Sequence, residues 1–180
     1  MHPLIRNFYT MTRTANQSRK KQCGFTLLEV LIALLILSIG LLGLASLQTS
    51  GLRSNQMASM RTTSTQLAYD IADRMRANPV GVDAQNYVIA TGDADPVIPA
   101  GENCENVTCT SAQMATYDLA QWRGAVRSLP GGTSSIARTV TGTVVTHTIT
   151  IFWDEYRQGI SGTACGPDPS VDLRCMSLTI

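Results

Sequence analysis

The chain has 180 residues, of which 14 are basic and 13 acidic. Residues 1–24 hold five of the basic side chains and no acid, so residues 25–180 carry nine arginines, no lysine and 13 acids, a net charge of −4. This balance argues against a primary nucleic-acid-binding protein, which normally presents a basic patch. The part of the chain that follows its N-terminal apolar segment is long enough for one domain with a single core.

Residues 25–47 form an apolar stretch long enough to cross a membrane. As a helix these 23 residues would span roughly 34 Å, against a hydrocarbon core of about 30 Å. The stretch is too long for a secretory signal, and no small-x-small cleavage site follows it. The upstream basic residues predict, by the positive-inside rule, a cytoplasmic N-terminus and a translocated C-terminal part.

One carboxylate, Glu29, stands immediately before residues 30–52, which contain no charge. One interpretation is an interfacial carboxylate that reaches toward the lipid headgroups. The other is that Glu29 pairs with a cation inside an apolar assembly. A cut after Gly24 would give Phe25 a free amino group, and Glu29 of the same chain or of a neighbouring copy would then have a partner.

Residues 53–78 are predicted to continue the helix as an amphipathic second half. Apolar residues such as Met60, Ile71 and Met75 recur at three- and four-residue spacing, with charged residues between them. Asn78-Pro79 predicts the end of the helix, because the residue before proline is disfavoured in the helical conformation.

The next elements are a connection and a second helix. Turn residues indicate an irregular segment over residues 80–111, with one short strand near 87–89. A helix is expected over 113–129, where Pro130-Gly131-Gly132 ends it. Its apolar residues fall on one side: Leu119, Trp122, Val126 and Leu129.

Strand patterns follow at residues 136–140 and 143–153, broken at Gly142, and a terminal strand is expected at 174–180. In the middle strand His147, Ile149 and Ile151 alternate with threonines, which is typical of a half-buried strand. A long helix followed by an antiparallel sheet predicts an α+β fold. Trp122 and Trp153 are interpreted as core residues.

Four cysteines lie after the apolar segment. Their even number, in a part of the chain expected to face an oxidising compartment, predicts two disulfides. Three connectivities exist, and the sequence-local one is favoured because each bond closes a short loop. The favoured pairs are Cys104 with Cys109 and Cys165 with Cys175.

No pattern of catalytic or cofactor-binding residues was found, and we expect a protein without enzymatic activity, cofactor or metal. Asp154 and Glu155 are adjacent and are interpreted as solvated charges at a strand end. His147 is interpreted as a polar strand residue without a catalytic partner. Three acids recur in the connecting segment without the spacing of an EF-hand: Asp93, Asp95 and Glu102.

The run from Lys21 through Gly24, Phe25 and Glu29 to Leu34 resembles the class III signal of type IV pilins and type II secretion pseudopilins. The resemblance implies a long N-terminal helix packed on a C-terminal antiparallel sheet. It also implies cleavage between Gly24 and Phe25 by a prepilin peptidase, N-methylation of Phe25, and a role for Glu29 in assembly. The expected segments are a leader (1–24), a transmembrane and assembly helix (25–52) and a periplasmic domain (53–180) that includes the amphipathic half 53–78.

Segments farther along resemble the PilV family of type IV pilus minor pilins. They are the run of residues 67–79, Asp118-Leu119-Ala120-Gln121-Trp122, Leu129-Pro130-Gly131-Gly132 and Ile151-Phe152-Trp153. The resemblance implies a minor pilin that primes or caps pilus assembly in a tip complex, with the major pilin, other minor pilins and a large tip adhesin as partners. It implies an inner-membrane protein with a periplasmic domain that enters the pilus. Two alternatives remain: a minor pseudopilin of type II secretion, and a membrane-anchored periplasmic binding domain that does not polymerise.

Overall fold

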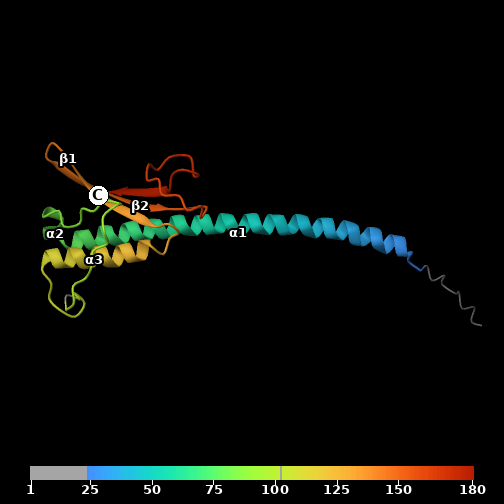
Figure 1. Cartoon of the computed structure of the whole chain (residues 1–180), viewed down its shortest axis with the longest axis horizontal. Helices are drawn as coiled ribbons and strands as arrows, with labels where there is room; N and C mark the ends of the chain where they lie inside the picture. Colours follow the sequence, from blue (N-terminus) through green and yellow to red (C-terminus); the bar gives the residue numbers. More distant parts are fainter. Residues whose placement is uncertain (1–23, 102) are drawn as a thin grey trace, which may run out of the picture. The chain divides into compact units, whose positions relative to one another are not determined.

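The computed structural model describes residues 24–101 and 103–180. The chain divides into two compact units, residues 1–47 and 48–180. Helix α1 (Leu27–Ala77) contributes to both units, and the second unit adds α2 (Pro79–Asp83), α3 (Ser111–Val126), β1 (Thr133–Thr141), β2 (Val144–Trp153) and β3 (Arg174–Thr179) (Figure 1). The prediction of a long helix followed by an antiparallel sheet, in an α+β fold of the type IV pilin kind, is confirmed.

The C-terminal half of α1 presents the predicted apolar face. Its buried residues recur every three or four positions: Met60, Ser64, Ala68, Ile71, Ala72 and Met75. Ser64 is the polar member of this set, and its hydroxyl donates to the carbonyl of Arg61 at 2.9 Å within the helix. The helix can therefore bury a serine without leaving its hydroxyl unsatisfied.

Asn78-Pro79 ends α1 as predicted, and it also begins a helix that the sequence analysis missed. The side chain of Asn78 accepts from the Gly81 N–H, and Pro79 occupies the first turn of α2. Proline suits this position because its fixed φ matches a helix and its missing N–H is not needed there. The expected strand near residues 87–89 is reduced to a single bridge between Ile89 and Ile136.

Helix α3 begins with a complete capping box. Thr110 accepts from the Gln113 N–H through its side chain, and the Gln113 side chain accepts from the Thr110 N–H. The helix ends at Val126, three residues before the predicted end, but Leu129 remains buried beyond it. The predicted apolar face of this helix is therefore confirmed, although Leu129 lies in the turn that follows the helix.

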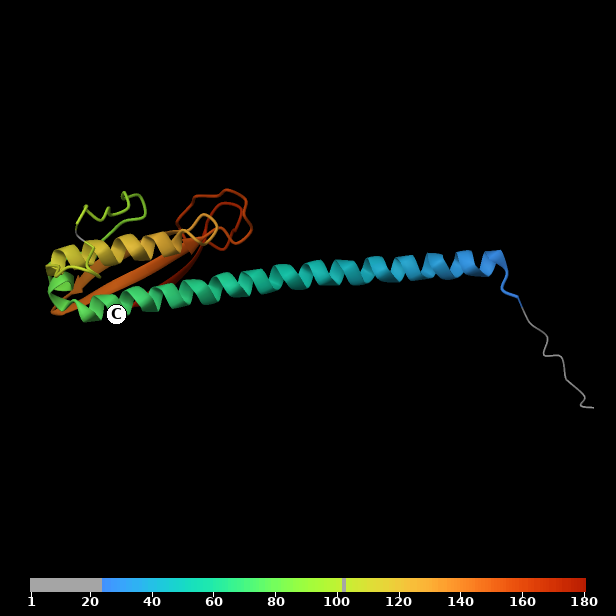
Figure 2. The ribbon, with the colours of Figure 1, turned by 90° about the horizontal axis from the view of Figure 1, so that it is seen from below.

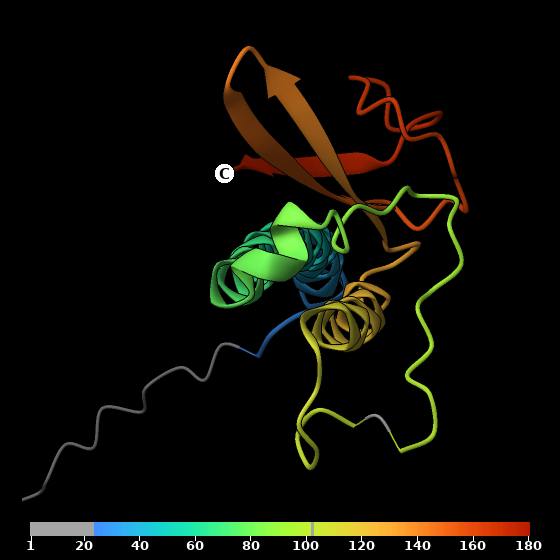
Figure 3. The ribbon, with the colours of Figure 1, turned by 90° about the vertical axis from the view of Figure 1, so that its left-hand side faces the viewer.

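The three strands form one antiparallel sheet in the order β1-β2-β3. In the register, Ile136 of β1 faces Ile149 of β2, and Ile151 of β2 faces Met176 of β3. Figure 3 shows α1 and α3 on the same side of the sheet. Alternation along β2 directs Ile149 and Ile151 to this side, so the predicted half-buried strand is confirmed.

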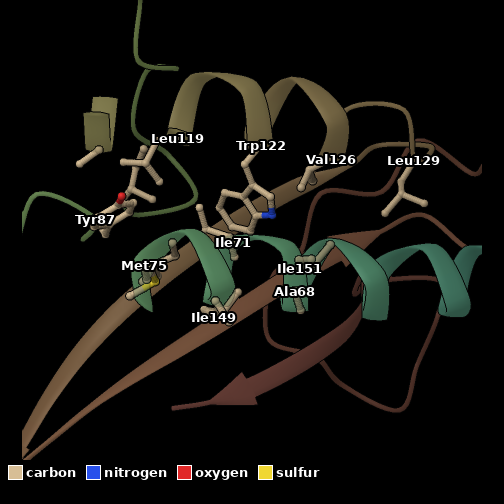
Figure 4. Close-up of a cluster of buried hydrophobic side chains, with 14 of the residues drawn as sticks. Ala68, Ile71, Met75, Tyr87, Leu119, Trp122, Val126, Leu129, Ile149 and Ile151 are labelled. Atoms are coloured by element: carbon tan, nitrogen blue, oxygen red, sulfur yellow. The ribbon is translucent and has the colours of Figure 1, made fainter. Parts of the chain in front are cut away.

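The core lies between the two helices and the sheet. Trp122 of α3 is fully buried, and its indole N–H donates to the carbonyl of Leu67 in α1 at 2.9 Å. Figure 4 shows Trp122 among Ile71, Ala68 and Val126, and Figure 2 shows α3 running alongside the C-terminal half of α1. This hydrogen bond satisfies the polar end of the buried indole and contributes to fixing α3 on α1.

Candidate functional site

The first turn of α1 is capped by Thr26. The backbone N–H of Glu29 donates to the Thr26 hydroxyl oxygen at 3.2 Å. A threonine three residues before a glutamate is the spacing of a capping box, and a carboxylate near a helix N-terminus also interacts favourably with the helix dipole. Glu29 therefore stabilises the helix start locally. The sequence analysis missed the role of Thr26, although this spacing could have revealed it.

Gly24, Phe25 and Glu29 are close together at this end of the helix. The Phe25 side chain is 83% exposed, and a Cβ atom placed on Gly24 would meet no heavy atom within 4 Å among the described residues. Phe25 and Glu29 line one shallow hollow of about 440 Å³ with Ala33, Leu34 and other apolar side chains of the same helix face. The segment around the Gly24–Phe25 bond is therefore accessible. Glu29, which is the only acid among the described residues 24–47, lies close to it.

The N-terminal part of α1 is apolar and exposed around its whole circumference. Of the described helices, α1 alone is long and apolar enough to cross a membrane, and its most apolar window contributes nothing to a core. A helix that is apolar on every side must be covered by lipid or by other helices. The exposed side chains include Leu31, Leu35, Ile39, Leu42 and Leu47.

The interpretation of Asp154 and Glu155 as solvated charges is wrong. Both residues are buried, with exposed fractions of 3% and 6%. Glu155 accepts from Arg61 of α1 at 2.9 Å through one carboxylate oxygen and from Arg174 of β3 at 3.1 Å through the other. A buried carboxylate is tolerated only with such partners, and these two are 94 and 19 residues away in sequence.

Asp154 organises the turn that follows β2. Its two carboxylate oxygens accept from the backbone N–H groups of Tyr156, at 3.2 Å, and Gly159, at 2.7 Å. Burial by itself would raise the pKa of Asp154, but hydrogen bonds from the backbone of residues 156–159 lower it below its usual value. Arg157 and Gly159 adopt positive φ values of 55° and 74° in this turn.

A second buried polar network joins α1, α2 and α3. The Tyr87 hydroxyl donates to Asp118 at 2.6 Å and accepts from the Asn78 amide at 3.2 Å. Arg74 of α1 donates to the same Asp118 carboxylate at 3.2 Å. Burial, together with the hydrogen bond to Asp118, raises the pKa of Tyr87. This network positions elements and presents no open site.

The acids of the connecting segment have structural partners. Asp93 accepts from the Ala90 N–H at 2.7 Å, and Asp95 pairs with Arg123 at 3.3 Å and with Arg127. Glu102 lies outside the described residues. Within the described ranges, no group of three or more histidine, cysteine or acidic residues has the arrangement of a metal site.

His147 is a buried strand residue. Burial and the charge of Arg138 lower its pKa, and Asp83 opposes this effect. Trp153 is also buried, as expected of a core residue.

The structure joins Cys104 to Cys109 and Cys165 to Cys175, with Cα atoms 5.5 Å apart in each pair. The second bond ties the loop after β2 to the start of β3. The leader residues 1–23, including Cys23 and all the basic residues of the proposed cytoplasmic end, lie outside the described residues.

Comparison with known families gives two adjacent matches. Residues 19–45 match the prokaryotic N-terminal methylation motif, and residues 46–120 match the model of the type IV pilin Tt1218. The chain has no significant match among curated proteins or solved structures. Type IV pilins are structural proteins, and the methylation motif implies processing by a prepilin peptidase and assembly with other pilins. The two matches and the α+β fold with its exposed apolar helix support a type IV pilin that is anchored in the membrane by α1.

Proposed function

We propose that this protein is a minor pilin of the PilV family that primes or caps type IV pilus assembly through its N-terminal helix. The observation that carries the proposal is the carboxylate of Glu29 at the start of α1, whose N-terminal part is apolar and exposed on every side. The match of residues 46–120 to a type IV pilin favours the pilus over type II secretion. The PilV-like segments between residues 67 and 153 favour a tip or initiation complex with other minor pilins, the major pilin and a large adhesin.

The proposed mechanism begins in the inner membrane, with the N-terminus in the cytoplasm and residues 53–180 in the periplasm. Residues 25–52 hold the subunit there. Prepilin peptidase cuts between Gly24 and Phe25, and the new amino group of Phe25 is methylated. The protein acts as a structural subunit, without catalysis of its own.

Assembly then depends on charge pairing between helices. Glu29 pairs with the N-terminal amine of a neighbouring subunit as the apolar helices pack together. An unpaired charge inside such a bundle costs several kcal/mol, so the pair selects one axial stagger of adjacent helices. The globular part, which is stabilised by its core and two disulfides, then caps or nucleates the filament.

The favourable charge of Glu29 at the helix start must be separated from its proposed assembly role. Glu29→Gln keeps a side-chain oxygen at this position and leaves the backbone N–H that Thr26 caps, but it removes the charge. Thr26→Ala removes the cap and retains the charge. We expect Glu29→Gln to be cleaved normally but to abolish priming, and Thr26→Ala to retain priming. The measurement is the amount of sheared surface pili, with an immunoblot of the processed protein.

Normal piliation with Glu29→Gln would contradict the charge-pairing role. Gly24→Val tests the processing step, since a β-branched residue before the bond should leave the leader attached. Normal removal of the leader from Gly24→Val would contradict the proposed cleavage after Gly24. If the partners that co-purify are secretion pseudopilins, the alternative system is correct; if none co-purify and the leader stays on, the protein is an anchored binding domain.

A further inference from the structure

The turn after β2 has a fixed backbone and carries an exposed arginine, Arg157, at its tip. The buried Asp154 carboxylate holds its backbone by hydrogen bonds from Tyr156 and Gly159. Glu155 fastens the same segment to α1 through Arg61 and to β3 through Arg174. Two consecutive buried acids thus fix the loop, while Arg157 and Gln158 at its tip remain exposed.

This loop lies against α1 at the first charge after the apolar segment. The Arg53 guanidinium lies 5.5 Å from the centroid of the Tyr156 ring, which is a cation–π contact. Arg53 directly follows residues 30–52, which are uncharged. Both residues belong to the unit of residues 48–180, so their contact lies within one compact unit.

Four arginines gather around this loop, which itself holds two acids, so the net charge here is +2. Four of the nine arginines of residues 25–180 lie on it or contact it: Arg53, Arg61, Arg157 and Arg174. The acids of the loop are the buried Asp154 and Glu155, whereas the rest of this part of the chain holds five arginines and 11 acids. Within the described residues no carboxylate forms an ion pair with Arg53 or Arg157, so their charges are available to an external partner.

The position of Arg53 in sequence matches the depth of lipid headgroups. The 23 uncharged residues 30–52 would span roughly 34 Å as a helix, slightly more than a hydrocarbon core of about 30 Å. Arg53 would then lie at the level of the phosphates. Tyrosine and arginine both suit this level, because each has an apolar body and a polar end.

We propose that Arg53, Tyr156 and Arg157 form a basic collar that binds anionic phospholipid headgroups on the outer side of the membrane while the subunit is stored there. This proposal rests on the membrane storage stated under the proposed function. The collar orients the globular part on the membrane surface before assembly. Extraction of the helix into a filament would break these contacts, so the collar holds the subunit in the membrane until its neighbours engage it.

A photo-crosslinking experiment on the full chain tests the collar. The chain is reconstituted into vesicles of phosphatidylcholine with or without phosphatidylglycerol, with p-benzoylphenylalanine in place of Gln158. The matched control places the same group at Thr139, an exposed residue of β1. Thr139 pairs with Thr146 of β2, which lies roughly 23 Å along the strand from Trp153.

We expect lipid adducts at Gln158 that are several-fold more abundant than at Thr139 and that increase with phosphatidylglycerol. Each basic side chain near an anionic surface changes binding roughly five-fold, so the double variant Arg53→Gln/Arg157→Gln should lose most of the increase. Circular dichroism of the variants checks that they are folded. Equal adducts at both positions, or no dependence on phosphatidylglycerol, would overturn the collar.

Two further outcomes separate this proposal from the proposed function. If alkaline carbonate releases the chain from native membranes, the membrane storage fails and the collar fails with it. If the chain is retained but Gln158 crosslinks only to protein in native membranes, the collar binds an acidic partner rather than lipid. In that case the lipid proposal is wrong and the minor-pilin proposal stands.

Discussion

The Glu155 carboxylate lies 2.9 Å from the Arg61 guanidinium, although 94 residues separate them in sequence. The side chain of Glu155 is 1% exposed and that of Arg61 is 64% exposed, so the pair joins the interior of the second unit to the surface of α1. Arg174 completes the arrangement at 3.1 Å. One buried carboxylate thus connects α1, the loop after β2 and β3.

The shared carboxylate predicts strong coupling between the two arginines. Arg61→Ala and Arg174→Ala should each lower the free energy of unfolding by about 1 kcal/mol, because the other arginine still pairs with Glu155. The double variant should cost about 3–5 kcal/mol, because the buried carboxylate is then left without a partner. A double-mutant cycle by thermal unfolding in detergent measures the difference; purely additive effects would show that Glu155 does not couple the two residues.

Asp154 should make stability depend on acid pH. Its folded-state pKa is lowered by backbone hydrogen bonds, so the ionised carboxylate stabilises the fold above the unfolded-state value of about 3.9, and this contribution is lost as pH falls below it. Asp154→Asn should cost about 2–3 kcal/mol at pH 7, since hydrogen bonds to a charged group are lost.

The difference between wild type and Asp154→Asn should shrink as pH falls from 5 to 3. Unfolding melts over that range measure it. A constant difference across the range would mean that ionisation of Asp154 does not stabilise the turn.

Two glycines should respond oppositely to alanine. A Cβ on Gly132 would clash with the Val126 carbonyl oxygen, so Gly132→Ala forces the turn between α3 and β1 to shift. We expect a loss of about 2–4 kcal/mol, as for other large steric conflicts. Gly124 lies inside α3 with no heavy atom within 4 Å of its Cβ position, and Gly124→Ala should stabilise by about 0.5–1 kcal/mol. A melting temperature that does not fall for Gly132→Ala would contradict the steric conflict in the turn. A melting temperature that falls for Gly124→Ala would contradict the open space around Gly124 in α3.

The two disulfides should differ in their contribution to stability. They close loops with sequence separations of 5 and 10, for which chain entropy predicts about 2 and about 3 kcal/mol. The pair Cys165–Cys175 also anchors the loop that carries Tyr156 and Arg157 of the basic collar. Alanine replacement of each pair, followed by thermal unfolding, should show the larger loss for Cys165/Cys175; a larger loss for Cys104/Cys109 would contradict the entropic argument.

Local signals in the sequence sufficed for the main elements. Asn78-Pro79 marked the end of α1 because proline restricts the residue before it. Alternation of threonines with apolar residues within the predicted strand 143–153 indicated the element that forms β2. The spacing of Met60, Ile71 and Met75 indicated the buried face of α1, because residues three or four positions apart lie on the same side of a helix.

Long-range pairing explains what the sequence analysis missed. Nothing local to Glu155 indicates that Arg61 and Arg174 approach it, so a solvated charge was the natural interpretation. Asp154 instead accepts from the backbone of the turn that directly follows it. The network of Tyr87 with Asp118 also joins residues 31 positions apart. By contrast, the cap at Thr26 and the start of α2 at Pro79 follow from local spacing and were overlooked. The candidate site at Gly24, Phe25 and Glu29 came from a sequence motif, and the structure adds the cap and the exposure of the helix around it.

The most direct test of the central claim is the N-terminal sequence and intact mass of the protein isolated from membranes of its own host, with and without reduction. The account predicts a chain that begins at methylated Phe25, with a mass lower by four hydrogens before reduction because of two disulfides. A chain that begins at Met1 would contradict the account, because neither the free amine that pairs with Glu29 nor a pilin-type assembly would then exist.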